Sequence, residues 1–305
     1  MLDGWWSGSA HRVAREAPAP IVEIGNRKAS PGGAGNAALN VAMLGGRSNA
    51  VGIIGDDATA IELSTQLEAA GVDTELLRQM AGEHTTSKVR VSVDNHVVVR
   101  LDDVNPAVSE AVSVAFTEAI KTALAECDAL LVCDYGGALI VDAVLSALGE
   151  STRPPLVVVD ARDPGRWREL APDVSTPNAA EAERITGVTL GSGEARAAAA
   201  VTHAEGLLAA TGAHSVIVTL DESGTILLRP ESEPHRTHAA PALERHASGA
   251  GDVFAAAFTL ASAAGIAAES AADFAQRAAD IAVRSEGTCV CATADLISTS
   301  TEQTR

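Results

Sequence analysis

The chain is short of positive charge. Its 305 residues carry 22 lysines and arginines against 40 aspartates and glutamates, which gives a formal net charge of −18 at pH 7. A protein of this sign repels nucleic acids and anionic membranes, so we expect neither as a partner. Nucleotides are not excluded, because Mg2+ and local backbone N–H groups can neutralise phosphates at the site itself.

Cysteine is also scarce, and the four that are present form no recognisable pattern. Cys127, Cys133, Cys289 and Cys291 include no Cys-x-x-Cys pair, and no histidine lies at the spacing of a zinc site. We therefore expect reduced thiols, buried for the most part, and a cytoplasmic setting.

Long hydrophobic runs are missing as well. The longest apolar stretch, at about 253–268, is interrupted by Thr259, Ser262 and Gly265. The first residues show no basic region followed by an apolar block. The sequence therefore predicts neither a signal peptide nor a membrane-spanning helix.

Short apolar runs alternate with alanine-rich stretches along most of the chain. Hydrophobic residues make up 47% of it, and the length suffices for one large domain with a deep core, with or without a small appendage. The alternation predicts an α/β fold in which parallel strands form a sheet covered by helices. Strands are predicted at about 50–55, 129–133, 156–160 and 215–219, and helices at 58–71, 109–127, 142–148 and 179–186.

Acidic residues fall at or just past the carboxyl ends of three predicted strands. They are Asp134, Asp160 and Asp221. Ligands of open parallel sheets gather at that edge, so these residues mark the edge where a site is expected.

Two regions lack the strand–helix rhythm and predict a small antiparallel flap. Residues 13–26 have strand-like patterning, and residues 86–93 and 97–102 alternate valine with polar residues at period two. One face of this flap is cationic, which suits either a solvated surface or contact with a phosphorylated substrate. The cationic residues are Lys88, Arg90 and Arg100.

The most informative features are two glycine-rich turns, each followed by an apolar, helix-like stretch. The first runs from Pro31 to Asn36, and the second is Gly249-Ala250-Gly251-Asp252. A glycine-rich turn that opens a helix directs free N–H groups and the positive end of the helix dipole at one point. Each turn alone is also explained as an ordinary helix cap. Together, with Asp252 beside such an anion site, they favour phosphoryl transfer to a sugar.

These two turns, in this order, resemble the signatures of the ribokinase-like (PfkB) carbohydrate kinases, and the resemblance extends from Met1 to about Thr293. The stretches 16–22 and 86–91 are similar to those of heptose 7-phosphate kinases, including the kinase half of bifunctional heptose kinase/adenylyltransferases. The resemblance implies a ribokinase-like three-layer α/β/α sandwich over residues 1–305, with a mainly parallel central sheet and flap segments at about 12–30 and 84–103. It also implies ATP and Mg2+, with transfer of the γ-phosphoryl group to the anomeric hydroxyl of heptose 7-phosphate.

The resemblance implies roles for individual residues too. Asp252 would be the base, and the amides of Gly249, Ala250 and Gly251 would receive the phosphoryl charge. Glu181 would organise Mg2+ indirectly, and an ordinary carboxylate on the helix surface is the alternative interpretation. The sugar substrate would contact Asp3, Gly32, Gly33, Asn36, Lys88, Arg90, Arg100 and Asp134, and the nucleotide would contact Asn178, Glu181, Thr219, Asp221, Gly224, Gly249 and Gly251.

Some positions depart from the family pattern. His246 stands ahead of the second turn where relatives have an acidic residue, and the loop after Asp134 lacks their lysine. Relatives also carry a buried strand ahead of the position of Met1, so we expect a core strand to be missing from residues 1–305. Another sugar or nucleoside kinase of the family and a catalytically weak sugar-binding homologue are the alternative hypotheses. A homodimer formed through the flap is also expected.

Overall fold

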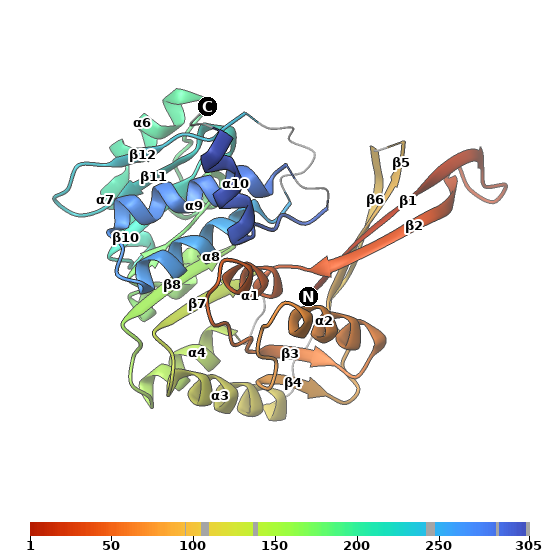
Figure 1. The fold of residues 1–305 in the computed structure, drawn as a ribbon, viewed down its shortest axis with the longest axis horizontal. Coiled ribbons are helices and arrows are strands. Elements are labelled where there is room, and N and C mark those ends of the chain that lie inside the picture. The colour runs from red at the N-terminus through yellow and green to blue at the C-terminus, as the bar shows by residue number, and fades with distance from the viewer. Residues whose placement is uncertain (95, 105–109, 137–139, 242–247, 285–286, 303–305) are drawn as a thin grey trace.

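The protein is described by a computed structural model that covers residues 1–94, 96–104, 110–136, 140–241, 248–284 and 287–302. A six-stranded sheet forms its centre, in the order β12-β11-β10-β9-β8-β7 (Figure 1). The four strands from β7 to β10 run parallel, and β11 and β12 add antiparallel pairs at one end. The strands are β7 (Ala129–Asp134), β8 (Leu156–Ala161), β9 (Val174–Ser175), β10 (Ser215–Thr219), β11 (Thr225–Leu228) and β12 (His235–Thr237).

Helices cover both faces of this sheet, because its strands are apolar on both sides. Val158 packs into the cluster formed with α8 and α9, whereas its neighbours Val157 and Val159 pack toward α3 and α4 on the opposite face. A further cluster joins β10 and β11 to α5, α6 and α7. The predicted three-layer α/β/α architecture is confirmed. The helices are α1 (Ala34–Met43), α2 (Ala58–Ala69), α3 (Glu110–Leu124), α4 (Ile140–Gly149), α5 (Ala179–Thr186), α6 (Glu194–Thr202), α7 (Ala204–Thr211), α8 (Ala250–Ala263), α9 (Ala268–Ala282) and α10 (Thr293–Glu302).

The remaining large element is a four-stranded flap that projects away from this body (Figure 1). Its order is β2-β1-β5-β6, and its outer pairs are antiparallel, as predicted. The central pair, β1 with β5, runs parallel, because helices and strands that lie in the body separate the two in sequence. The flap strands are β1 (Leu2–Val13), β2 (Pro20–Pro31), β5 (Ser87–Val93) and β6 (His96–Asp103).

Strand β1 was not predicted from the sequence. It is poor in β-branched residues, and small residues occupy several of its positions. Tertiary packing explains two of them: a Cβ at Gly4 would lie 2.9 Å from Val89 Cγ2, and one at Gly8 would collide with the carbonyl oxygen of Glu23. The glycines that weaken the strand signal in the sequence are thus required by close neighbours in the flap.

A second, two-stranded sheet stands apart from the central one. It pairs β3 (Gly52–Gly55) with β4 (Leu77–Met80), and within the described ranges it shares no ladder with β7. An apolar cavity of about 440 Å³ lies between them, lined by Ile53 on β3 and Leu131 on β7 and by residues of α1, α2, α3 and α8. This cavity separates β3 from β7, so the two sheets do not join within the described residues.

Most predicted elements are found within a few residues of their expected bounds. The strand at 215–219 and the helix at 179–186 match β10 and α5 without change. None of the helices in the described ranges is both long and apolar enough to cross a membrane.

Candidate active site

Asp252 lies in the first turn of α8, directly after a tight glycine turn. Gly249 has φ +89°, and a Cβ there would lie 2.6 Å from Asn36 Nδ2, so both the backbone and the close contact require glycine. No side chain of the described residues caps this helix. The first-turn N–H groups of α8 are therefore left for solvent or for an anion.

The two glycine-rich turns meet at the Asp252 carboxylate. Asn36, in the first turn of α1, donates from Nδ2 to Asp252 Oδ2 at 2.9 Å. Asn40 fixes the orientation of that amide, because its own Nδ2 donates to Asn36 Oδ1 at 3.0 Å. Both asparagines are fully buried. The segments 31–36 and 249–252 thus form one polar cluster, although more than 200 residues separate them.

The environment of Asp252 favours its protonated form. Burial raises the pKa of Asp252 to about 7, and the negative charge of Asp160 adds to this effect. Hydrogen bonds from Tyr135 and Asn36 act in the opposite direction. A carboxylate that exchanges its proton near neutral pH suits general-base chemistry.

Tyr135 and Asp160 complete the surroundings of this carboxylate. The phenol of Tyr135, in the turn after β7, contacts Asp252 Oδ1 and lies 3.3 Å from Asp160 Oδ2. Thr176 Oγ1 donates to Asp160 Oδ1 at 3.1 Å. Burial raises the pKa of Asp160 to about 6, and the hydrogen bond from Thr176 opposes the rise.

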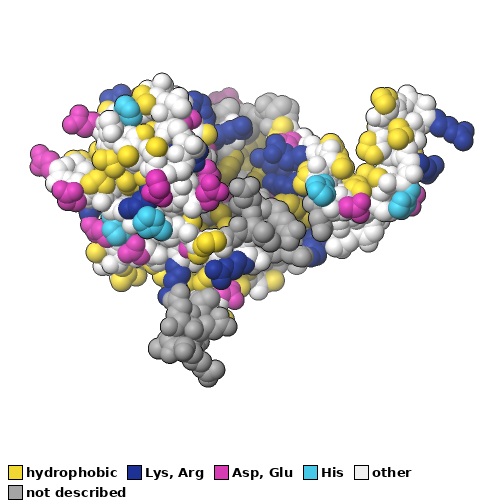
Figure 2. Space-filling model, turned by 90° about the horizontal axis from the view of Figure 1, so that it is seen from above, with side chains coloured by type: hydrophobic (Ala, Val, Ile, Leu, Met, Phe, Trp, Pro, Cys, Tyr) yellow, Lys and Arg dark blue, Asp and Glu magenta, His cyan; other side chains and the backbone are white. Residues whose placement is uncertain are grey.

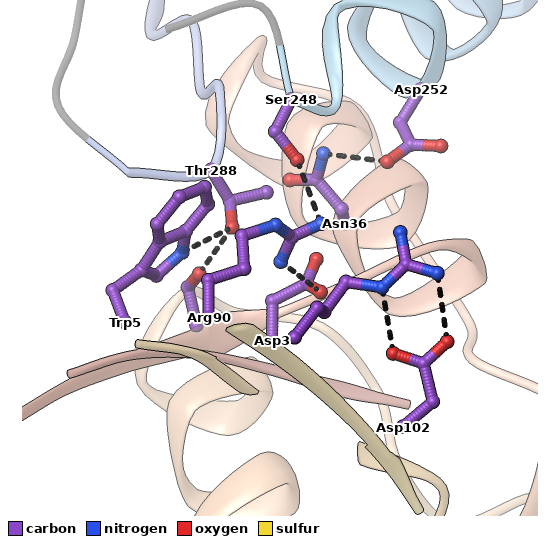
Figure 3. A network of polar contacts seen from close by, with 10 residues as sticks. Asp3, Trp5, Asn36, Arg90, Asp102, Ser248, Asp252 and Thr288 are labelled. Atoms are coloured by element: carbon purple, nitrogen blue, oxygen red, sulfur yellow. Dashed lines mark hydrogen bonds and ion pairs between the residues drawn. The ribbon is translucent and has the colours of Figure 1, made fainter. Parts of the chain in front are cut away.

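On the flap side, Arg90 joins three parts of the chain (Figure 3). Its Nη1 donates to Asp3 Oδ1 at 2.9 Å, and its Nη2 donates to Ser248 Oγ at 3.3 Å. The guanidinium also lies over the Trp5 ring, 4.5 Å from its centroid. Arg90 therefore connects flap strands β1 and β5 to the turn that precedes α8.

A second group of polar residues lies farther along the carboxyl edge of the sheet. Asn178 caps α5 by accepting from the backbone of Glu181 at 2.9 Å, and Glu181 Oε2 accepts from the backbone of Asn178 at 2.9 Å. Asn178 also bridges to Thr219 at the end of β10. Burial raises the pKa of Glu181, with the charge of Asp160 contributing.

Comparison with known proteins identifies the family. The model of the pfkB family carbohydrate kinases matches residues 9–295. The chain belongs to this family.

Curated relatives of this pfkB-family chain carry the name bifunctional protein HldE. The one from Alkalilimnicola ehrlichii is 35% identical over 83% of the chain and 51% of its own length, and the one from Azotobacter vinelandii is 33% identical over 87% and 54%. The chain spans about half the length of these relatives.

Solved structures share the fold at lower identity. Phosphofructokinase-2 from Escherichia coli, in complex with substrates and products, superposes with a TM-score of 0.77 at 20% identity, covering 100% of this chain and 96% of that one. Ribokinase from Cryptococcus neoformans, in complex with ADP, gives 0.74 at 23% identity, covering 97% and 96%. The ribokinase-like fold of this pfkB-family kinase is confirmed.

The structure brings the predicted sugar-binding residues to one region, with one exception. Gly32 bonds to the carbonyl of Met1 at 3.0 Å, beside Asp3, and Gly33 lies against the Tyr135 ring. Asp134 instead points into the body, where its carboxylate accepts from Trp167 Nε1 at 3.1 Å and from Gly136 N at 2.8 Å. The substrate-binding role of Asp134 stays a prediction to which these contacts lend no support.

The flap cations of this pfkB-family kinase share one face of the sheet. Lys88 and Arg90 are two residues apart on β5, and Arg100 is directly opposite Arg90. Arg100 donates two hydrogen bonds to Asp102, at 2.7 and 2.9 Å, and Figure 3 shows both as dashed lines that end at the Asp102 carboxylate. In Figure 2, Lys and Arg side chains gather where the flap leaves the body.

Two more of the residues predicted to bind the nucleotide, Asp221 and Gly224, lie in the turn after β10. Asp221 is exposed and pairs with Arg196 at 2.8 Å, while the carbonyl of Gly224 accepts from Leu220 N at 2.8 Å. His246 lies outside the described residues, so its effect on the adjacent turn stays a prediction.

Sequence analysis missed Tyr135 and Thr288 as members of the site. Thr288 accepts from Trp5 Nε1 at 3.3 Å and from Ser30 Oγ at 2.7 Å, which ties the loop near the end of the chain to the flap. No local pattern marks either residue. The position of Tyr135 immediately after a predicted strand end is the one signal that could have found it.

Proposed function

We propose that this chain is an ATP-dependent kinase that phosphorylates the anomeric hydroxyl of heptose 7-phosphate. The observation that carries the proposal is the buried Asp252 beside the uncapped start of α8, with Asn36 bonded to it. Similarity to the HldE proteins at 30–35% identity and to heptose 7-phosphate kinases in two sequence stretches supports the choice of sugar. The flap face that carries Lys88, Arg90 and Arg100 supports a phosphorylated acceptor, whose phosphate would compete with Asp3 and Asp102 for the two arginines.

In the proposed reaction, Asp252 accepts the proton of the acceptor hydroxyl as the phosphoryl group, supplied by ATP, is transferred. The first-turn amides of α8 stabilise the negative charge that develops. Asn36 orients the carboxylate of the base by donating to its Oδ2, and Asn40 in turn orients the amide of Asn36. Phosphoryl transfer requires little covalent work from the protein, so positioning of this kind dominates the rate.

The polar cluster of Asn178, Glu181 and Thr219 supports a nucleotide site at the same sheet edge. Among the described residues, no three His, Cys, Asp or Glu side chains form a cluster that could hold a metal alone. This fits Mg2+, which retains several waters and is held through one or two carboxylates together with substrate phosphates. Glu181 is the carboxylate we assign to it, and the ion would neutralise phosphate charge.

The test is an ADP-release assay with MgATP and a panel of acceptors: heptose 7-phosphates, hexose phosphates, free pentoses and nucleosides. We expect turnover with a heptose 7-phosphate, and a loss of about 10²–10⁴ in the Asp252→Asn variant. Preference for a free sugar or a nucleoside would reject heptose 7-phosphate as the substrate and favour another sugar or nucleoside kinase of the family. Binding without turnover of any acceptor would favour the sugar-binding alternative.

We also propose a homodimer formed through the flap, in a reducing, cytoplasmic environment. Valine and leucine side chains on β6 are about half exposed, which an isolated flap does not explain. The low cysteine content, four in 305 residues with no Cys-x-x-Cys pair, supports the reducing environment. Light scattering measures the mass of the protein and of a variant that carries both Val97→Lys and Val99→Lys. The two added charges are expected to dissociate the dimer. A variant with the same mass as the wild type would contradict a dimer formed through the flap. The apolar residues are Val97, Val98, Val99 and Leu101.

A further inference from the structure

Tyr135 occupies an unusual position: it is the only tyrosine of the chain, and it bridges two carboxylates. Its ring lies over the first glycine turn, where a Cβ on Gly33 would lie 3.0 Å from Tyr135 Cε2. Its hydroxyl contacts Asp252 Oδ1 and lies 3.3 Å from Asp160 Oδ2. One side chain thus connects the end of β7, the end of β8 and the first turn of α8.

The direction of these hydrogen bonds follows from the chemistry of the groups. Tyr135 is 40% exposed, but desolvation of its hydroxyl and the two neighbouring carboxylates raise the pKa of Tyr135 well above its usual value, so the phenol keeps its proton. An ionised carboxylate only accepts, and therefore the phenol donates. Asn36 donates to Oδ2 of the same aspartate at 2.9 Å. Both oxygens of Asp252 then have a neutral donor from the protein, one from each turn region.

Asp160 acts on Asp252 in the opposite sense. It has no direct bond to Asp252 among the described contacts, and it approaches through the shared phenol. Its negative charge disfavours a second negative charge nearby. The titratable or hydrogen-bonding groups that act on Asp252 from the surrounding elements are Asp3 on β1, Asn36 on α1, Cys133 on β7, Tyr135 in the turn after it, Asp160 on β8 and Cys289 near the end of the chain.

We propose that Tyr135 and Asp160 are positioning residues that together set the pH at which Asp252 can accept the substrate proton. The phenol stabilises the ionised base by donating to it, whereas Asp160 destabilises the ionised base by its charge. The inference rests on the proposed function in taking Asp252 as the base. The three side chains titrate as one coupled unit, so a measured midpoint belongs to the unit.

Opposite shifts in two near-isosteric variants distinguish this arrangement from a purely structural one. Tyr135→Phe removes the donor and leaves the ring, so the acidic limb of kcat/KM moves up from about pH 7 by about one pH unit. Asp160→Asn removes the charge and leaves a hydrogen-bonding amide, so the limb moves down by about one pH unit. Loss of structure would lower kcat/KM at every pH and would move neither limb.

A matched control is available at the opposite end of the same sheet. Asp173→Asn likewise removes one carboxylate charge. Asp173 Oδ2 accepts from Val157 N at 2.7 Å and pairs with Arg153 at 3.3 Å, and it has no contact with Asp252 among the described residues. The acidic limb of kcat/KM in Asp173→Asn is expected to stay at the wild-type pH. Limbs that move in the same direction in Tyr135→Phe and Asp160→Asn, or that do not move, would overturn the proposal.

A second measurement does not depend on turnover. Because the chain has one tyrosine, incorporated 3-fluorotyrosine reports on position 135 alone. Its ¹⁹F shift should titrate with a midpoint near pH 7 in the wild type, move down in Asp160→Asn, and lose this transition in Asp252→Asn. A ¹⁹F titration that is unaffected by Asp252→Asn would refute the coupling. If the titration behaves as expected but no acceptor is phosphorylated, the proposed function fails and the coupled unit stands.

Discussion

Replacing the base by asparagine is expected to stabilise the protein while it lowers turnover by about 10²–10⁴. Asp252 is 7% exposed, and burial raises its pKa to about 7 from the ordinary value of 3.8. The folded state therefore binds the proton more tightly than the unfolded state does. The contribution of the protonated Asp252 carboxyl to the free energy of unfolding is fully present below about pH 3.8 and is lost as the pH rises through about 7.

The size of the effect follows from the two pKa values. A rise from 3.8 to about 7 corresponds to about 4 kcal/mol at pH 8, where the folded protein must hold a buried negative charge. At pH 5 most of the folded molecules keep the proton, and the cost falls to about 2 kcal/mol. The Asp252→Asn variant carries no charge at this position at either pH and retains an amide oxygen for Asn36, so it is expected to gain these amounts.

Thermal unfolding of both proteins at pH 5 and pH 8 measures this gain. For 305 residues, an unfolding entropy of about 2.1 cal/mol/K per residue converts about 4 kcal/mol into a rise of about 6 °C at pH 8, with a smaller rise at pH 5. Turnover should fall by about 10²–10⁴ in the same preparation. Equal melting differences at the two pH values, or a variant less stable at pH 8, would show that the buried charge is not the cause.

Two further predictions concern the turn and the flap. Gly249→Ala should lower the free energy of unfolding by about 1–3 kcal/mol, because alanine is strained at φ +89° and its Cβ meets Asn36. Gly251 has open space around it, so Gly251→Ala should leave the melting temperature within about 1 °C or raise it. Equal losses of stability in the two variants would contradict the argument. Arg90→Met leaves the Asp3 carboxylate buried without its ion pair and should lower the free energy of unfolding in urea by about 3 kcal/mol. Adding Asp3→Asn to the same chain should recover part of that loss. Additive losses in the double variant would exclude the Arg90–Asp3 ion pair as the cause.

Local pattern predicted the body of the protein well. The strand at 215–219 and the helix at 179–186 follow from short apolar runs and from the Asn178–Glu181 capping box, both of which act over a few residues. Strand β1 escaped prediction because the close approach of Glu23 and Val89 selects its glycines. These neighbours are distant in sequence or belong to another strand, so the residue pattern around each glycine does not reveal why glycine is required there.

The sequence by itself determined the family, the two glycine turns and the identity of the candidate base, since each depends on residue types at short spacing. Tertiary structure alone decided how those residues act on one another. It placed Asn36 against Asp252, turned Asp134 toward Trp167 and set Tyr135 between two carboxylates. Burial and Coulomb interactions depend on three-dimensional distance, and for that reason the protonation of Asp252 follows only from the folded chain.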